Sequence, residues 1–315
     1  MTVFFIKLLA LIFMTIDHFA AFFEDILLSE FSVAGRHISL YMFLRLIGRI
    51  SYPLFAFSVG IGLKHTKDLK SHTERLLMFA IISQLPLLLL EILSRNNIIK
   101  LAGGYAYFVN IMFTFLVASV FAYIHEKLIK DRAIGDKIIG IVCISIIWLT
   151  FYMFDDFASN NSLPIFYFIK SSDYAPFGIL LPFFIYLAKT KFQYALTTIV
   201  FLIMIYEADF STFYGILLIA FVLFGLLLIF YCENVFSGKM KILYYVSALL
   251  YCVVFWGLFS NYKSDISLFV VFASIALPAI LLYNGEKGGS LKYLFYVYYP
   301  LHLFAFAILA NVFVY

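Results

Sequence analysis

Charged residues are scarce in this chain. Asp, Glu, Lys and Arg make up only 13% of its 315 residues, whereas 64% are hydrophobic. A soluble domain has roughly twice that share of charged residues. Neither a soluble globule of this length nor a disordered chain accommodates so much apolar surface. The mean hydropathy of +1.02 therefore indicates a polytopic membrane protein, and its apolar runs suit helices rather than the short strands of a barrel.

Cysteine and basic clusters are also nearly missing. The three cysteines, Cys143, Cys232 and Cys252, lie inside apolar runs without metal-ligand spacing, so we interpret them as packing residues and expect no metal site. The net charge of +4 is dispersed, and no basic arm indicates a nucleic-acid partner. The chain has no phosphate-binding glycine loop, zinc signature or nucleophile elbow. Candidate functional residues are therefore sought among ionisable groups inside apolar runs.

Hydropathy predicts about eleven membrane spans. Their approximate bounds are 3–23, 39–63, 76–93, 107–125, 137–154, 175–188, 192–206, 212–232, 242–259, 266–283 and 292–314. The first is expected to be a retained helix and not a signal peptide, because Asp17 and His18 interrupt it and no cleavage site is evident. No internal repeat or linker divides the chain, so we predict a single all-α membrane domain over residues 1–315.

Lys and Arg concentrate in alternate loops, and this sets the predicted orientation. The even-numbered loops are rich in basic residues, whereas the first loop is acidic. We therefore place the even loops in the cytoplasm, with the N-terminus inside and the C-terminus on the extracytoplasmic side of the cell membrane. The second loop carries Lys64, Lys67, Lys70 and Arg75, and the tenth carries Lys287 and Lys292.

The first predicted helix holds Lys7, Asp17 and His18. Lys7 and His18 are separated by nearly three full helical turns, so they share one face at an axial distance of roughly 16 Å. Either Lys7 extends to the inner head groups and His18 only bonds within the bundle, or the two residues belong to a functional site.

The second predicted helix holds Arg45 and Arg49, one turn apart on a shared face. Asp17 and Arg49 have similar depths in their helices, so we predict that they pair at mid-membrane. The pair either sets helix registry, or Asp17 orients His18 while an arginine meets an anionic substrate group. Pro53, in the middle of this stretch, is expected to bend the helix.

Further polar residues mark three other spans. His302 lies in the last span and is either a packing residue or a site residue. Asn110 and Thr114 are one turn apart and serve either as interhelical hydrogen bonders or as cavity lining. Asp173 precedes the sixth span and is interpreted mainly as its cap.

These residues fall in motifs that resemble the TraX family. The resemblance covers most of the chain, and its motifs recur in order. They are Met14-Thr15-Ile16-Asp17-His18, Arg45 to Phe57, His65-Thr66-Lys67, Asn110 to Thr114, Asp173 to Gly178 and Tyr299-Pro300-Leu301-His302. The chain departs from the family pattern at Tyr174-Ala175-Pro176, where a Tyr-Gly pair is usual.

The resemblance implies an activity and a set of roles. The family's namesake is a pilin N-acetyltransferase of conjugative plasmids. The wider superfamily of transmembrane acyltransferases carries a basic residue, ten residues and a histidine on its first helix, which Lys7 and His18 match, and a late histidine that His302 resembles. By resemblance, His18 is the base or acyl relay beside Asp17. The donor phosphates of acetyl-CoA would contact basic residues, for which the candidates are Lys7, Arg45, Arg49, Lys64 and Lys67.

The predicted function is therefore a membrane acetyltransferase. Acetyl-CoA is the expected cytoplasmic donor, and the extracytoplasmic acceptor is an amine or hydroxyl of a pilin-like peptide, cell-wall polymer or glycan. An imidazole suits the required base, and Arg45, Arg49 and Asn110 are candidates to stabilise the oxyanion. The alternatives are a transporter or lipid flippase that uses the same charges, and a non-catalytic membrane assembly factor.

Overall fold

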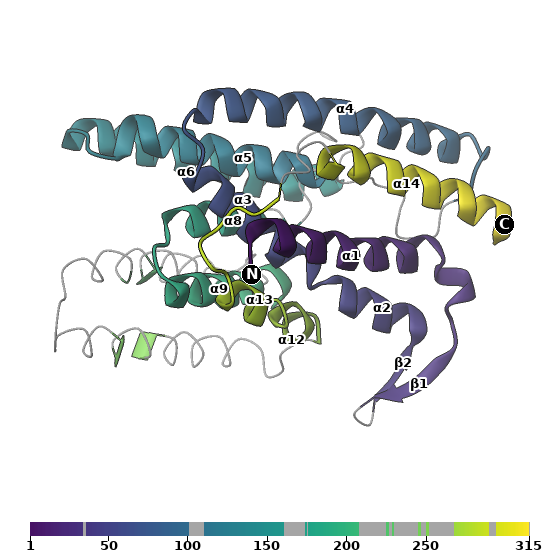
Figure 1. Ribbon diagram of the computed structural model, residues 1–315. Helices are drawn as coiled ribbons and strands as arrows, with labels where there is room; N and C mark the ends of the chain where they lie inside the picture. The colour runs from purple at the N-terminus through teal and green to yellow at the C-terminus, as the bar shows by residue number, and fades with distance from the viewer. Residues whose placement is uncertain are drawn as a thin grey trace.

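The computed structural model describes residues 1–33, 36–100, 110–160, 174, 176–207, 225–226, 229, 245–246, 250–251, 268–289 and 294–314. Helices dominate this part of the chain (Figure 1). They are α1 (Val3–Phe22), α2 (Leu40–Gly48), α3 (Ser51–Lys64), α4 (Leu69–Arg95), α5 (Ile111–Ile124), α6 (Ile134–Asn160), α8 (Phe177–Leu187), α9 (Lys191–Glu207), α12 (Leu268–Ser274), α13 (Leu277–Leu281) and α14 (Leu294–Phe313).

The described residues include six helical segments long and apolar enough to cross a membrane. They are Val3–Phe22, Leu40–Lys64, Leu69–Ser94, Ile111–Ile129, Ile134–Tyr152 and Leu294–Phe313, and shorter apolar helices lie at Phe177–Leu187, Lys191–Tyr206 and Leu268–Leu281. The expectation of a helical membrane protein is thus confirmed. The spans predicted at 212–232 and 242–259 lie almost wholly outside the described residues, so the total of eleven and the orientation stay predictions.

One hairpin interrupts the helical pattern. Strands β1 (Glu30–Val33) and β2 (Arg36–Ser39) pair antiparallel in the predicted first loop, with Glu30 opposite Ser39. The hydroxyl of Ser39 then accepts a hydrogen bond from the backbone N–H of Met42 at 3.1 Å and caps α2. The hairpin therefore places the start of α2 close to the end of α1.

The predicted second span is interrupted between α2 and α3. Pro53 is the third residue of α3, where its missing N–H does little harm. It has no N–H to donate to the carbonyl of Arg49, and the helix is broken at Arg49 and Ile50. The expected bend exists, but it precedes the proline instead of lying at it.

Helix α4 begins before the predicted residue 76. Asp68 caps it, because its Oδ1 accepts from the Ser71 backbone N–H at 3.1 Å and its Oδ2 from the Ser71 hydroxyl at 2.6 Å. Arg75 therefore lies on the second turn of α4 and not in a loop. The hydrogen bonds from Ser71 also hold the pKa of Asp68 below its usual value, so this carboxylate stays ionised.

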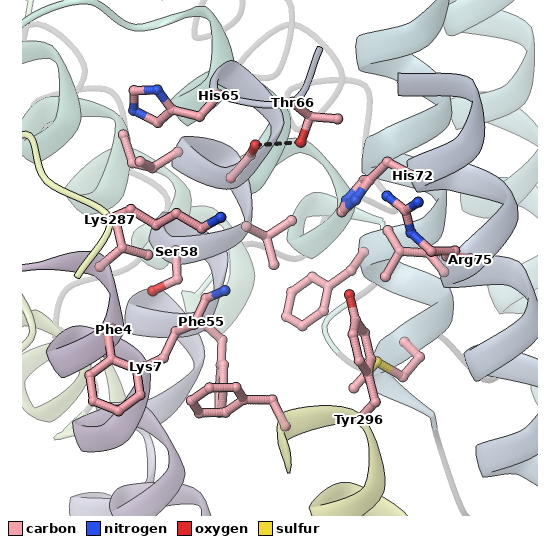
Figure 2. Close-up of a pocket in the computed structure, with 18 of the residues that line it drawn as sticks. Phe4, Lys7, Phe55, Ser58, His65, Thr66, His72, Arg75, Lys287 and Tyr296 are labelled. Carbon is pink, nitrogen blue, oxygen red and sulfur yellow. Dashed lines mark hydrogen bonds between the residues drawn. The ribbon is translucent and has the colours of Figure 1, made fainter. Parts of the chain in front are cut away.

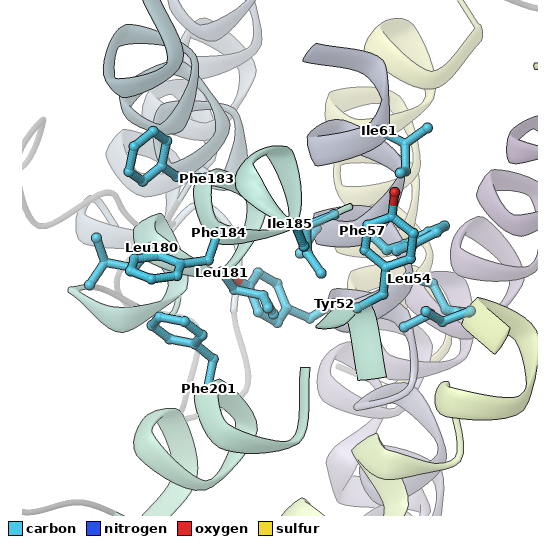
Figure 3. Close-up of a cluster of buried hydrophobic side chains, with 14 of the residues drawn as sticks. Tyr52, Leu54, Phe57, Ile61, Leu180, Leu181, Phe183, Phe184, Ile185 and Phe201 are labelled. Atoms are coloured by element: carbon cyan, nitrogen blue, oxygen red, sulfur yellow. The ribbon is translucent and has the colours of Figure 1, made fainter. Parts of the chain in front are cut away.

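A buried cluster joins α3 to α8 and α9 (Figure 3). Gly60 permits the close approach of α3 to α8, since a Cβ at position 60 would lie 2.6 Å from the carbonyl oxygen of Pro182. These side chains would otherwise face lipid, so dispersion and close packing hold the helices together more than exclusion of water does. The cluster includes Tyr52, Leu54, Phe57, Ile61, Leu180, Leu181, Phe183, Phe184, Ile185 and Phe201.

Helix α14 lies between α1 and α4 (Figure 1). Helix α5 also packs against α4 and touches α3. The last helix of the chain is thus seated against the first, while the two termini lie apart. This arrangement places α1, α3, α4, α5 and α14 around a common space.

Candidate functional site

A cavity of about 440 Å³ lies among these five helices (Figure 2). One end is lined by residues of the α3–α4 connection and the start of α14, and its charged and imidazole side chains are Lys7, His65, Lys67, Asp68, His72, Arg75 and Lys287. The other end reaches Met14, Met112 and Tyr299. The cavity thus has a mainly cationic mouth, with Asp68 as an anion among the basic groups, and leads into an apolar interior.

The segment before α14 brings Lys287 to the mouth. The backbone N–H groups of Val3 and Phe4 donate to the carbonyl oxygens of Glu286 and Lys287, each at 3.0 Å. The first N–H groups of a helix have no partner within the helix, so this segment satisfies two of them at the start of α1. Gly288, with φ of +72°, permits the contact, because a Cβ there would lie 2.4 Å from the Thr2 hydroxyl oxygen.

Lys7 and Met14 line the cavity from α1. The Lys7 ammonium lies 5.7 Å from the ring centroid of Phe295 at the start of α14. His18 lies one turn beyond Met14 on the same stripe of the helix. The structure therefore brings the face that carries Lys7 and His18 toward the cavity and α14.

Ser58 lines the cavity from α3. Its side chain is fully buried, and its hydroxyl oxygen has no hydrogen-bond partner among the described residues. Buried polar groups are nearly always hydrogen-bonded, so an exception calls for water or a ligand. Ser58 and Lys7 both line the cavity, and both are drawn in Figure 2.

The two lysines at the end of α3 have different positions. Lys67 lines the cavity mouth, as expected for a phosphate contact. Lys64, which was predicted to bind the donor, instead donates to the carbonyl oxygen of Ala188 and, at 2.9 Å, to the hydroxyl of Tyr194. The carbonyl end of α8 attracts this cation. Lys64 is therefore not among the residues that the structure brings to the cavity, and its assignment to the donor site stays a prediction.

Two histidines meet beyond the inner end of the cavity. His18 Nδ1 lies 2.6 Å from His302 Nε2, and the two rings stack with centroids 4.9 Å apart. Tyr299, which lines the cavity, has its ring centroid 6.4 Å from that of His18. His302 is thus neither isolated nor a simple packing residue.

Asp17 pairs with Arg45 and not with Arg49. Asp17 Oδ2 lies 2.7 Å from Arg45 Nη1. Arg49 comes at the break between α2 and α3, where it donates to the Tyr174 hydroxyl at 3.2 Å and lies 5.4 Å from the ring centroid of Phe269. The predicted Asp17–Arg49 pair is wrong because equal depth does not make two side chains face each other.

Asp17 and His18 face different helices. Neighbouring residues of a helix point about 100° apart, and here the Asp17 carboxylate faces α2 while the His18 ring faces α14. The hydrogen-bond partner of His18 Nδ1 is therefore His302 instead of Asp17. Asp17 acts on the site as the charge partner of Arg45.

Asn110 ties α5 to α4. Its Oδ1 accepts from the Met112 backbone N–H at 3.0 Å, and its Nδ2 donates to the Ala80 carbonyl and the Ser83 hydroxyl, both at 3.0 Å. The side-chain amide is fully engaged, so it does not supply an oxyanion donor. Asp173 lies outside the described residues.

Sequence reasoning missed part of the cavity wall. Lys287 and Arg75 were noted only as loop charges that set orientation, and no functional role was predicted for Ser58. No pattern in the sequence signals that these residues share a cavity. Within the described ranges no group of three or more His, Cys, Asp or Glu side chains is placed to hold a metal ion.

Comparison with known protein families identifies a matching family. The family model described as TraX protein matches residues 4–259. No curated protein and no solved structure matches the chain significantly.

Proposed function

The chain belongs to the TraX family, and from this premise we propose that it is a membrane-embedded acetyltransferase. It transfers an acetyl group from cytoplasmic acetyl-CoA to an extracytoplasmic amine or hydroxyl, such as that of a pilin-like peptide, cell-wall polymer or glycan. The observation that carries this proposal is the cavity, which runs from a cationic mouth to Tyr299, beside the His18–His302 pair.

The mouth suits a nucleotide that carries several phosphate charges. Lys7, Lys67, Arg75 and Lys287 line it, and clustered ammonium and guanidinium groups attract phosphates and bind them with charge-assisted hydrogen bonds. All four come from segments expected on the cytoplasmic side, where acetyl-CoA is made available. The nucleotide end of the donor is therefore assigned to this mouth.

The interior suits the pantetheine arm. Lys7 and His18 are separated by roughly 16 Å along α1, a distance comparable to an extended pantetheine. The Ser58 hydroxyl lines this path without a partner among the described residues, and an amide of pantetheine supplies the hydrogen bond that it lacks. The thioester would then lie near Tyr299 and within reach of His18.

The chemistry at that point is acyl transfer. The amine or hydroxyl attacks the thioester carbon while His18 removes its proton. The carbon–sulfur bond then breaks, and the leaving thiolate takes the proton from His18. The Arg45 guanidinium, which pairs with Asp17, is the candidate to stabilise the oxyanion that forms.

The direct test is a sided assay with purified protein in sealed vesicles of known orientation. We expect radiolabelled acetyl-CoA on the cytoplasmic side to acetylate an acceptor peptide or glycan supplied on the other side, and acetyl-CoA to raise the melting temperature. Flux of a solute or lipid without acetyl transfer would identify a transporter. Acetyl-CoA that neither stabilises the protein nor reacts would contradict an enzymatic role.

A further inference from the structure

A chain of three groups runs from α14 to α1. The carbonyl oxygen of Tyr298 lies 2.7 Å from His302 Nδ1, and His302 Nε2 lies 2.6 Å from His18 Nδ1. Each distance is that of a hydrogen bond. Each bond also needs one proton between its two heavy atoms, so the chain restricts where the protons of both rings reside.

The Tyr298 carbonyl determines which nitrogen of His302 carries the hydrogen. A carbonyl oxygen only accepts, so His302 Nδ1 carries the hydrogen. In a neutral imidazole the other nitrogen then has the lone pair, and His302 Nε2 is an acceptor. The hydrogen between the two rings must therefore belong to His18 Nδ1. A neutral His18 with hydrogen on Nδ1 has its basic lone pair on Nε2.

We infer that His302 is a positioning residue that holds His18 in the Nδ1–H tautomer and so makes Nε2 the proton-accepting atom. The catalytic consequence rests on the proposed acetyltransferase function. The tautomer itself rests only on the two hydrogen bonds. It specifies the nitrogen of His18 that acts, which neither the family assignment nor the sequence does.

The surroundings hold His302 in place. Its side chain is buried, and its ring stacks on Tyr298 at 4.8 Å and meets the ring of Phe306 edge-on at 5.9 Å. A second link lies one turn away, where the Thr15 hydroxyl donates to the Leu11 carbonyl and therefore accepts from the Tyr298 hydroxyl at 2.7 Å. This link keeps α1 and α14 in register, so the histidine contact is preorganised.

This arrangement accounts for every proton that moves in the proposed reaction. Nε2 of His18 takes the proton of the attacking amine or hydroxyl, and the resulting imidazolium keeps its Nδ1–H bond to His302. The bond to a charged donor is stronger than to a neutral one, which favours the protonated state as it forms. When the carbon–sulfur bond breaks, the Nε2 proton passes to the thiolate and neutral His18 is restored.

The tautomer is directly measurable. The full chain is labelled with ¹⁵N-histidine, reconstituted in nanodiscs without donor, and its six histidines are observed by ¹⁵N NMR, with His18→Gln identifying the His18 signals. We expect a protonated Nδ1 and an unprotonated Nε2 at neutral pH. A wild-type His18 with hydrogen on Nε2 would overturn the inference, whatever the protein catalyses.

Variants at position 302 test the cause. His302→Leu removes the acceptor at similar volume, so His18 should revert to the Nε2–H form that free histidine prefers. His302→Gln keeps an acceptor oxygen and should retain part of the Nδ1–H population. His37→Leu, on the β1–β2 hairpin, removes an exposed histidine that takes no part in this contact and serves as the matched control with an unchanged tautomer.

Kinetic measurements then distinguish a role of His302 in positioning His18 from a purely structural role in the fold. We expect His302→Leu to lower kcat about a hundredfold, the size of effect typical of a displaced general base, with little change in the KM for acetyl-CoA or in the thermal shift that it produces. His302→Gln should recover part of kcat, and His37→Leu on the exposed hairpin should have no effect. Unchanged kcat in folded His302→Leu would remove the positioning role. Absence of transfer in the wild type would instead count against the proposed function and leave the NMR result intact.

Discussion

Gly48 lies directly against Asp17 where α2 meets α1. A Cβ at position 48 would stand 2.3 Å from the Cβ of Asp17 and 2.4 Å from its Oδ1. Real side chains do not tolerate such contacts, so only glycine allows the two helices to approach this closely. The approach places Arg45, one turn earlier on α2, within 2.7 Å of the Asp17 carboxylate.

Gly48→Ala should therefore separate α1 from α2. We expect a loss of about 1–3 kcal/mol from overpacking, partly offset by the better helix propensity of alanine. The measurement is thermal unfolding in nanodiscs. Gly135→Ala is the matched control, because a Cβ there meets nothing within 4 Å, and it should be neutral or slightly stabilising. An equally stable Gly48→Ala would show that this contact does not constrain the helices.

Asp17 and Arg45 should be energetically coupled. Removing one partner leaves a mostly buried charge without its counterpart, which costs about 3–5 kcal/mol. Asp17→Asn and Arg45→Gln should each destabilise the protein, and the double variant should recover part of the loss. Asp17→Asn combined with Arg49→Gln provides the comparison and should be additive. Coupling to Arg49 and not to Arg45 would contradict the observed pairing.

His18 should be required for turnover and not for folding. His18→Ala removes the proposed base, and loss of a positioned base typically lowers kcat by about a hundredfold or more. Acetyl transfer is measured at a matched folded fraction, with the binding of acetyl-CoA followed by thermal shift as a control. Near wild-type turnover in this variant would remove His18 from the mechanism.

Variants of Lys7 and Lys287 should affect donor binding, whereas a variant of Lys64 should affect only stability. Lys7→Ala and Lys287→Ala remove cations from the cavity mouth, so the KM for acetyl-CoA should rise more than kcat falls. Added salt should weaken donor binding in the wild type and less so in these variants.

Lys64→Ala is the matched comparison, since Lys64 contacts the end of α8 and not the cavity. It should lower the melting temperature and leave the donor KM unchanged. A donor defect in Lys64→Ala, or none in Lys7→Ala and Lys287→Ala, would argue against the proposed mouth.

Ser58→Ala should weaken donor binding without disturbing the fold. Its hydroxyl has no partner among the described residues, so its removal strands no other group, and a lost hydrogen bond to the donor costs roughly 0.5–1.5 kcal/mol. The KM for acetyl-CoA should rise severalfold at nearly constant kcat. Thr197→Val removes another fully buried hydroxyl oxygen without a described partner, on α9 and away from the cavity, and should leave the KM unchanged. Identical donor affinity in Ser58→Ala and the wild type would exclude this contact.

Local patterns predicted several features well. The apolar runs identified a helical membrane protein, because a bilayer-spanning helix needs a long stretch of apolar residues. The helical period placed Lys7 and His18 on one stripe, which requires no knowledge of neighbours. The motifs on the first two helices led to the TraX family, and this resemblance is confirmed by the family match over residues 4–259.

Helix capping and strand pairing were harder to predict from the sequence. The hairpin of β1 and β2 is short and lies in the loop between the first two predicted spans, where hydropathy does not distinguish paired strands from an irregular loop. The early start of α4 depends on the Asp68 side chain bonding to Ser71, a polar signal that a hydropathy window averages away.

The contacts that define the site were decided by tertiary structure. His18 meets a histidine 284 residues further along the chain, and Asp17 selects Arg45 over Arg49 because α2 ends before Arg49. Lys64 turns to the end of α8, while Lys287, far away in the sequence, reaches the mouth beside Lys7. Hydropathy estimates how deep a residue lies in the bilayer, but it contains no term for the rotation of one helix about its axis relative to another. That rotation is set by close packing at points such as Gly48 and Gly60, and only the folded bundle reveals which side chains it brings together.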